Sequence, residues 1–218
     1  MIITIDGPSG VGKSTVSKSV ARKLGLLYLD TGAMYRAVAL KVKRVSIDID
    51  NDKELEALLN NTEIGFRKNE DNDLLIMLNN EDVTDEIRTP EISRLSSDVA
   101  TKRAVRTKLV QLQRDIGKTG DIVAEGRDMG TYVFPDAGFK FYLEASLDER
   151  ARRRWEQLRL SGTQIDLQIV KNEIIQRDAQ DMERTESPLH PAINAVIINT
   201  TNLSSDEVTD RIIKEVQG

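Results

Sequence analysis

The sequence contains no cysteine and one histidine, His190. The lack of cysteine excludes disulfides and thiolate metal sites, which suits a reducing compartment. A single histidine also leaves no histidine-based metal cluster. Because His190 lies between Pro188 and Pro191, we interpret it as a loop residue, with a catalytic role as the alternative.

Aromatic residues make up 4% of the chain and the net charge is −5. Few aromatics argue against a stacking platform for single-stranded nucleic acid, and this charge provides no field that attracts a polyanion. No apolar run approaches the roughly 20 residues that span a bilayer, and no signal-peptide pattern follows Met1. We therefore expect a cytoplasmic monomer that binds neither nucleic acid nor membrane.

One segment near the start of the chain matches the phosphate-loop pattern G-x-x-x-x-G-K-S/T. It follows the apolar run 2–5 and opens a helical pattern over 13–24, so strand, glycine turn and helix come in the required order. Its residues are Gly7, Pro8, Ser9, Gly10, Val11, Gly12, Lys13, Ser14 and Thr15. We expect its backbone N–H groups to bind the phosphates of ATP, Lys13 to reach the outer phosphates and Ser14 to bind Mg²⁺. The alternative is a glycine-rich turn with an incidental lysine.

Five apolar runs, at 2–5, 26–29, 121–124, 139–143 and 195–199, alternate with helical patterns. This alternation predicts an α/β fold with a five-stranded parallel sheet flanked by helices. The length of 218 residues suits a single domain, 1–218. Its core would comprise 1–61 and 89–218. A small β-rich insertion at about 62–88 would contain a hairpin of 62–67 and 74–78, joined by the polar segment 68–73, and a short strand around Val83.

Two arginines follow strands of the predicted sheet, Arg36 near the polar turn at Thr31 and Arg127 after the strand 121–124. The carboxyl edge of a parallel sheet is where ligands bind, and a guanidinium binds phosphate through two parallel hydrogen bonds. Asp128 has three candidate roles: a ligand of magnesium or water, an acceptor for a substrate amine, or a partner that neutralises Arg127.

The helical pattern at 166–184 carries a stripe that is apolar first and charged afterwards. Its members are Leu167, Val170, Ile174, Arg177, Asp181 and Arg184. Such a stripe fits a helix that leaves the core and borders a polar cleft; the alternative is a solvated helix end with Arg177 and Asp181 paired. The preceding helix, 147–161, is rich in arginine: Arg150, Arg152, Arg153, Arg154 and Arg159. These arginines form either a solvated face or a short lid near 150–165 over the phosphoryl group.

Together these segments resemble the bacterial cytidylate kinase family. The matching segments are 7–15, 30–36 (DTGAMYR), 125–131 (EGRDMGT), and Arg177-Asp178 with Asp181 and Arg184 ahead of 187–189. The resemblance implies the nucleoside monophosphate kinase fold, and phosphoryl transfer from ATP, with magnesium, to CMP and dCMP to give CDP and dCDP.

The resemblance also implies roles for individual residues. Catalysis would rest on Lys13, Arg127 and Asp128. The substrate phosphate would bind Thr31, Arg36 and Arg127, and the sugar would bind Arg177 and Asp181. The cytosine would face Ser97, Arg106, Asp128 and Arg184. These types suit cytosine, whose amine needs an acceptor and whose ring acceptors need donors.

Three other functions compete with this one. A related kinase would use AMP, UMP or a hydroxylated metabolite as acceptor. A GTP-dependent switch would share the phosphate loop, but the sequence has neither N-K-x-D nor D-x-x-G. A non-catalytic nucleotide-binding module would have no need of a second arginine cluster.

Overall fold

The computed structural model describes residues 1–68 and 74–218, which fall into two compact units. Unit 1 comprises Met1–Leu29 and Gly117–Gly218, and unit 2 comprises Asp30–Ile116. These boundaries differ from the predicted core and insertion. The arrangement of 1–218 as a single domain with an insertion at about 62–88 therefore stays a prediction.

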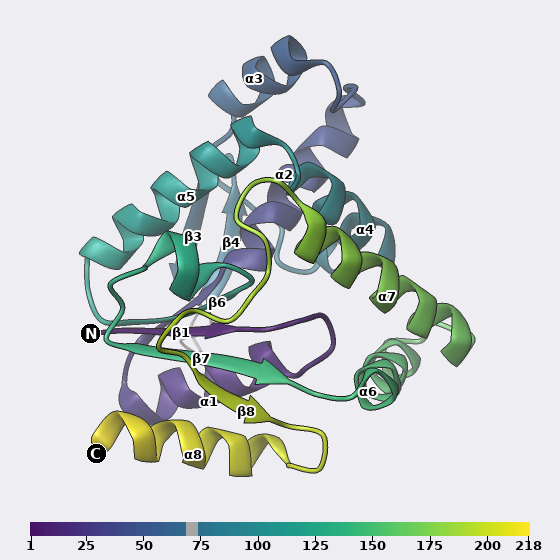
Figure 1. The fold of residues 1–218 in the computed structure, drawn as a ribbon. Helices are drawn as coiled ribbons and strands as arrows, with labels where there is room; N and C mark the ends of the chain where they lie inside the picture. Colours follow the sequence, from purple (N-terminus) through teal and green to yellow (C-terminus); the bar gives the residue numbers. More distant parts are fainter. Residues whose placement is uncertain (69–73) are drawn as a thin grey trace. The chain divides into compact units, whose positions relative to one another are not determined.

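Unit 1 is built on a five-stranded sheet (Figure 1). In spatial order its strands are β2 (Leu27–Asp30), β6 (Ile122–Gly126), β1 (Ile2–Asp6), β7 (Phe139–Glu144) and β8 (Val196–Asn199). Strand β1 pairs in parallel with β6 and β7, and β7 pairs in parallel with β8. Ile3 and Ile5 in the centre of β1 are fully buried, which is why this strand reads as a continuous apolar run. The predicted parallel α/β sheet is confirmed.

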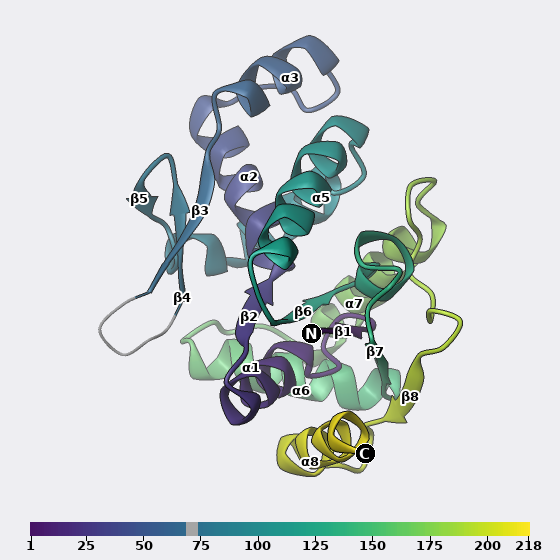
Figure 2. The same cartoon turned by 90° about the vertical axis from the view of Figure 1, so that its left-hand side faces the viewer.

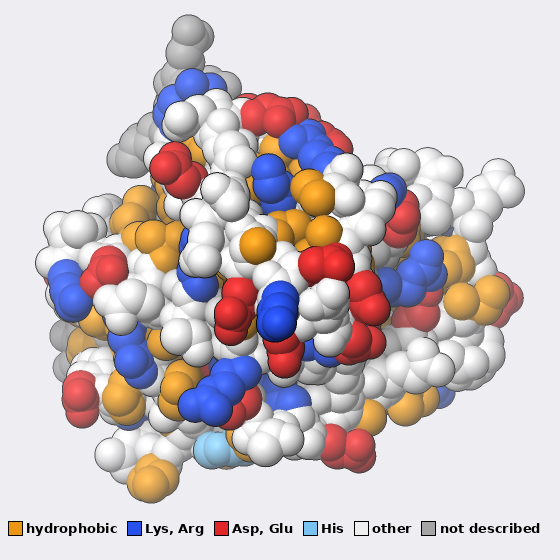
Figure 3. All heavy atoms as spheres, turned by 90° about the horizontal axis from the view of Figure 1, so that it is seen from above, with side chains coloured by type: hydrophobic (Ala, Val, Ile, Leu, Met, Phe, Trp, Pro, Cys, Tyr) orange, Lys and Arg blue, Asp and Glu red, His pale blue; other side chains and the backbone are white. Residues whose placement is uncertain are grey.

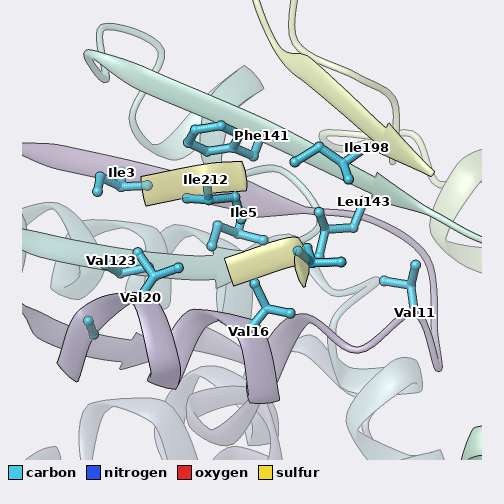
Figure 4. Packing of buried hydrophobic residues seen from close by; sticks show 12 residues of the cluster. Ile3, Ile5, Val11, Val16, Val20, Val123, Phe141, Leu143, Ile198 and Ile212 are labelled. Carbon is cyan, nitrogen blue, oxygen red and sulfur yellow. The ribbon is translucent and has the colours of Figure 1, made fainter. Parts of the chain in front are cut away.

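The main core of unit 1 lies between this sheet and the helices α1 (Lys13–Leu24) and α8 (Ser205–Gln217), which pack against each other. Figure 4 shows Val16 and Val20 of α1 and Ile212 of α8 directed toward the side chains of β1 and β7. Truncating a buried isoleucine such as Ile212 to alanine costs about 2–5 kcal/mol in a typical core. This packing fixes the start of α1, and with it the phosphate loop, against the sheet.

The helices α6 (Leu147–Leu160) and α7 (Leu167–Glu183) form a hairpin with a small core of its own. Ala151, Leu158, Val170 and Ile174 are buried in it, with Trp155 packed beside them. Leu167, by contrast, is 43% exposed, so the predicted apolar stripe begins one turn later than expected. The lid predicted near 150–165 corresponds to α6 and the turn after it, and its movement stays a prediction.

Unit 2 contains helices and a small antiparallel sheet (Figure 2). The helices are α2 (Thr31–Val45), α3 (Asp52–Asn60), α4 (Pro90–Val99) and α5 (Arg103–Lys118), the last of which ends in unit 1. The sheet contains β3 (Ile64–Lys68), β4 (Leu74–Leu78) and β5 (Glu81–Asp82), and a 3₁₀ turn follows at Glu86–Arg88. β3 and β4 pair in antiparallel, which confirms the hairpin. Most of its predicted polar connection lies outside the described residues.

Arg44 of α2 joins the helix to the segment that carries β5. Its guanidinium contacts Glu81 at 2.6 Å and Glu86 at 2.5 Å. The hydrogen bonds from Arg44 lower the pKa of Glu81. All three side chains are at least one-third exposed, so water and salt weaken the attraction.

Three local predictions need correction. The sequence favours Asp52 as the cap of α3, but Asn51 takes that position, because its side chain accepts the N–H of Glu54. The helical pattern in the sequence begins at Ala33, but α2 begins at Thr31, two residues earlier, because the Asp30 carboxylate caps it through the N–H of Ala33. The strand expected around Val83 is β5, which ends one residue before it, and Val83 itself is buried. No sequence pattern predicted the π-helical turn at Met129–Val133.

Acidic and basic side chains are intermixed over the face shown in Figure 3. This distribution agrees with the small net charge of −5, and neither sign dominates that face. Within residues 1–68 and 74–218, none of the helices is both long enough and apolar enough to span a lipid bilayer.

Candidate active site

The phosphate loop connects β1 to α1 in unit 1. Gly10 and Gly12 have φ angles of 76° and 97°, a region that favours glycine. Gly12 is also the N-cap of α1 and offers no side chain to the first N–H groups of the helix, and the first turn contains no acidic residue. Those N–H groups and the positive end of the helix dipole therefore favour an anion. This geometry supports a phosphate site over an incidental glycine turn.

Lys13 is buried, and its ammonium group bends back over the loop. Nζ donates to the carbonyl oxygens of Gly7 and Pro8, both at 2.7 Å. Burial lowers the pKa of Lys13 well below its usual value, and the positive charge of Arg127 lowers it further. Glu125 opposes this shift. The ammonium group is thus held on the loop beside a second cation, which favours binding of an anionic group by both.

Asp6 ends β1 immediately before the loop and was not singled out in the sequence. Its carboxylate accepts the N–H of Met129 at 2.9 Å and that of Gly130 at 2.8 Å. Burial raises the pKa of Asp6 to about 6, although both hydrogen bonds act in the opposite direction. Asp6 therefore joins the phosphate loop to the segment that follows Asp128. An acidic residue at the end of a buried strand was the signal that could have identified it.

Arg127 begins the loop after β6, and its strand is the parallel neighbour of β1. Asp6 and Gly126 are partners in the register, so the two loops leave the sheet side by side. The Nε of Arg127 donates to Asp181 of α7 at 2.7 Å. Burial opposes the charged guanidinium, but the carboxylates of Asp181, Asp178 and Glu125 together outweigh burial and raise the pKa of Arg127. In turn, Arg127 and Arg177 lower the pKa of Asp181 against the effect of its burial.

Asp128 and Arg184 form the other part of the same network. The two side chains are almost fully buried, and Arg184 Nη2 lies 3.5 Å from Asp128 Oδ1. Arg184 also lies 3.9 Å from Asp181 and donates through Nε to the carbonyl of Ser187 at 2.8 Å. The charged end of α7 is therefore buried against the β6 loop. The buried side chains of Asp181 and Arg184 contradict the alternative of a solvated helix end, whereas the pairing of Arg177 with Asp181 stays a prediction.

The arginines of α6 divide into inward and outward groups. Arg153 donates to the carbonyl of Val11 at 3.3 Å and to that of Thr200 at 2.6 Å. Arg152 lies on the surface, where it pairs with Glu149 and Glu156. The guanidinium of Arg159 lies over the ring of Trp155, and that of Arg154 donates to Gln157. Arg150 also faces the phosphate loop, so this helix is neither a solvated face alone nor a free set of lid arginines.

Unit 2 carries the other predicted substrate residues. Thr31 is buried at the start of α2, and five residues later Arg36 Nη2 lies 3.0 Å from Asp30 Oδ2. Arg106 of α5 is buried and donates to the hydroxyl of Tyr35 at 3.4 Å. Ser97 is half-buried on α4, which packs against α2.

Hydrogen bonds and ion pairs thus join four predicted site residues of unit 1: Arg127, Asp128, Asp181 and Arg184. Lys13 interacts electrostatically with Arg127, Asp181 and Arg177. Thr31, Arg36, Ser97 and Arg106 belong to unit 2. His190 is exposed, and its Nδ1 lies 3.0 Å from the carbonyl oxygen of Pro191, as befits the loop residue that the sequence predicted.

The fold is similar to that of solved structures, one of which is a kinase. A gluconokinase from Sinorhizobium meliloti covers 99% of the chain with a TM-score of 0.51 and 12% identity, and the chain covers 90% of it. TT1252 from Thermus thermophilus covers 100% of the chain with a TM-score of 0.52 and 20% identity, and 96% of that protein is matched. At these identities the likeness concerns the fold alone.

The sequence comparisons identify the family. The cytidylate kinase family model matches residues 3–218. The cytidylate kinase of Geobacter sulfurreducens is 46% identical over 97% of the chain and 91% of its own length, and that of Desulfitobacterium hafniense is 44% identical over 97% and 90%. The chain therefore belongs to the cytidylate kinase family, whose members are nucleoside monophosphate kinases.

Proposed function

We propose that this chain transfers the γ-phosphoryl group of ATP to CMP and dCMP, giving CDP and dCDP. One observation carries the proposal: the phosphate loop leaves one strand of the sheet, and the partly buried Arg127 and the buried Asp128 leave the neighbouring strand. A loop alone would support nucleotide binding. A second, partly buried basic group beside it supports a phosphorylated acceptor, and the cytidylate kinases among the relatives support CMP.

The donor half rests on the loop and Lys13. The N–H groups at the start of α1 would bind the phosphates of ATP, and Lys13 would exchange the carbonyls of Gly7 and Pro8 for phosphate oxygens. A negative ligand would raise the lowered pKa of Lys13, because an adjacent anion favours the ammonium form. Lys13 would then stabilise the charge that develops during transfer.

The protein offers a limited site for magnesium. Ser14 is exposed in the first turn of α1, and the described part of the chain contains no cluster of three acidic or histidine side chains. A single hydroxyl is enough for Mg²⁺, which commonly keeps several waters and is bound by one or two protein side chains together with the phosphate oxygens of the nucleotide. Ser14 would be its protein ligand, and the bound ion would supply neutralisation of phosphate charge.

The acceptor half rests on Arg127, with Arg36 and Thr31 of unit 2. Guanidinium groups would bind the CMP phosphate and direct one of its oxygens, already ionised near neutral pH, toward the γ-phosphorus. Such an acceptor needs no general base. In this proposal Asp128 and Ser97 accept from the cytosine amine, Arg106 and Arg184 donate to the ring acceptors, and the sugar binds Arg177 and Asp181. Uracil reverses these groups, so it would leave polar atoms unpaired.

The direct test is a panel of acceptors, CMP, dCMP, UMP, AMP and a hydroxylated metabolite such as gluconate, each incubated with ATP and Mg²⁺. We expect CDP and dCDP as the principal products, detected by chromatography. The absence of CDP would refute the proposal. Tight GTP binding without transfer would favour a switch, and faster turnover of another acceptor would identify a different kinase.

Substitution Arg36→Ala tests the acceptor half. It removes a guanidinium that we assign to the CMP phosphate, a charged interaction of about 1.5–3 kcal/mol, so KM for CMP should rise roughly tenfold to a hundredfold. The dissociation constant for ATP, measured by calorimetry, should stay within about twofold. Arg103→Ala, at an exposed arginine of the same unit, is the matched control. An equal loss of ATP affinity would show that Arg36 is wrongly assigned.

A further inference from the structure

Ser9 of the phosphate loop is bound on both sides of its backbone by one buried ion pair. Its N–H donates to Asp178 Oδ1 at 3.0 Å, and its carbonyl oxygen accepts from Arg150 Nη1 at 3.0 Å. The same Nη1 donates to the other oxygen of Asp178, which closes the arrangement. Arg150 and Asp178 are both at least nine-tenths buried. The N–H and the C=O of Ser9 are thus both engaged by side chains of the protein.

The two partners belong to the α6–α7 hairpin. Arg150 lies in the first turns of α6 and donates through Nε to the carbonyl of Ala145 at 3.2 Å, which fixes its orientation. The loop runs close against the backbone of α6: a Cβ added at Gly10 would lie 2.8 Å from the carbonyl oxygen of Arg150. The hairpin therefore contacts the loop through backbone packing as well as through the ion pair.

Asp178 lies on the same side of α7 as Asp181, the partner of Arg127. It precedes Asp181 by three residues, so the two buried carboxylates lie on the same side of the helix. Asp178 holds the phosphate loop, and Asp181 holds Arg127 at 2.7 Å. A single helix thus fixes one element of the proposed donor half and one of the proposed acceptor half.

Stability is a poor explanation for this pair. Removing two charges from water costs several kcal/mol, and apolar side chains of similar volume often serve the fold equally well. What the pair does provide is a fixed orientation of the Ser9 peptide, and through it of the N–H groups that follow at the turn of the loop. Orientation of these donors determines how well they meet a phosphate.

We propose that Arg150 and Asp178 are positioning residues that set the phosphate loop in its ligand-binding orientation and join it energetically to the α6–α7 hairpin. Neither needs to touch the nucleotide for this role. The inference rests on the proposed function where it is tested by KM values, because these require phosphoryl transfer to CMP. Its main claim concerns the binding of ATP, which is measured without catalysis. It predicts that loss of the pair weakens the donor side selectively.

The test compares Arg150→Gln, Asp178→Asn and the double variant with the wild type. ATP affinity is measured by calorimetry, and KM for ATP and for CMP by initial rates. Because each substitution breaks a charged hydrogen bond, we expect the dissociation constant and KM for ATP to rise about tenfold. The double variant should be about as impaired as the worse single variant, because the two residues act as a unit. For Arg150→Gln, CMP affinity should change less than about threefold.

Lys171→Gln provides the matched control. Lys171 and Asp148 form an exposed ion pair between the same two helices, so its loss tests for general loosening of the hairpin. Arg150→Lys tests geometry, because an ammonium keeps the charge without the fork that reaches Ser9 and Asp178 together; we expect partial recovery of ATP affinity. It also replaces Arg150→Gln should that variant fail to fold, as judged by urea unfolding.

ATP affinity within twofold of the wild type in folded Arg150 and Asp178 variants would overturn the inference. So would an equal loss in Lys171→Gln, or additive effects in the double variant. Since calorimetry needs no phosphoryl transfer, a wild type that binds ATP but forms no CDP would refute the proposed function while still testing the positioning role.

Discussion

The buried carboxyl of Asp6 should make the stability of the protein fall as the pH rises. Its pKa is about 6 in the folded chain, against 3.8 as the ordinary value, because burial disfavours the charged form. Between these pH values the folded state binds more protons than the unfolded state. The stabilisation is therefore complete below about pH 3.8 and is lost as the pH rises through about 6. A shift of about 2 pKa units corresponds to roughly 3 kcal/mol.

Asp6→Asn isolates this effect. Asparagine has nearly the same shape and stays neutral at all pH values, and its single carbonyl oxygen keeps one of the two hydrogen bonds to Met129 and Gly130. The lost bond lowers stability by an amount that does not depend on pH. The difference in free energy of unfolding between wild type and variant should therefore change with pH almost entirely because of the titration of Asp6.

Urea unfolding at a series of pH values from about 4 to 7.5 measures this difference. Wild-type stability relative to Asp6→Asn should fall by about 2–3 kcal/mol over that range, with half of the fall reached near pH 5, about midway between 3.8 and the folded pKa of about 6, and a plateau above it. Asp136→Asn, at an exposed carboxyl of the same unit, serves as the control for general charge effects. A difference that stays constant within about 0.5 kcal/mol, or moves in the opposite direction, would refute the reasoning.

Two further predictions concern glycine and a surface cluster. A Cβ at Gly7 would lie 2.3 Å from the carbonyl oxygen of Leu143, so Gly7→Ala should lower the free energy of unfolding by about 1–3 kcal/mol or more, measured with urea. Gly25→Ala, where φ is 68° and nothing lies within 4 Å, should cost only the strain of its backbone; equal losses would contradict the steric argument. Arg44→Gln should cost less than about 1 kcal/mol, and the loss should shrink when urea unfolding is repeated in high salt; a larger loss that salt does not change would show that exposure has been overestimated.

The strands and the phosphate loop could be predicted from the sequence because each is a local pattern. A run such as 2–5 must be buried on both faces, and the glycine spacing of the loop has few structural solutions. Boundaries were less certain where a side chain competes for the cap. Asn51 and Asp52 are both good caps, and nothing in the local sequence shows which one reaches the N–H of Glu54.

The partners of the charged residues could not be predicted in the same way. Arg127 is followed directly by Asp128 in the sequence, yet its Nε donates to Asp181, 54 residues away. Asp6 accepts from Gly130, 124 residues away, and Asp178 from Ser9, 169 residues away. The partner of each charged side chain depends on how the strands and helices pack. The residue type and its neighbours in the sequence carry no information about this packing.

These partner choices have a common physical consequence in unit 1. Phosphate loops bind polyanions, yet three buried carboxylates, Asp6, Asp178 and Asp181, lie in or beside this one. Each carboxylate accepts from a backbone N–H or a guanidinium, and none needs to face a phosphate to do so. Their negative charge weakens the raw attraction for a nucleotide, while their hydrogen bonds fix the orientation of Ser9, Met129 and Arg127. A kinase must bring two anions together and then release two anionic products, so very tight binding of the substrates would not make it faster. The rate increases through interactions that are stronger in the transition state than in the bound substrates, and such interactions depend on correctly oriented groups.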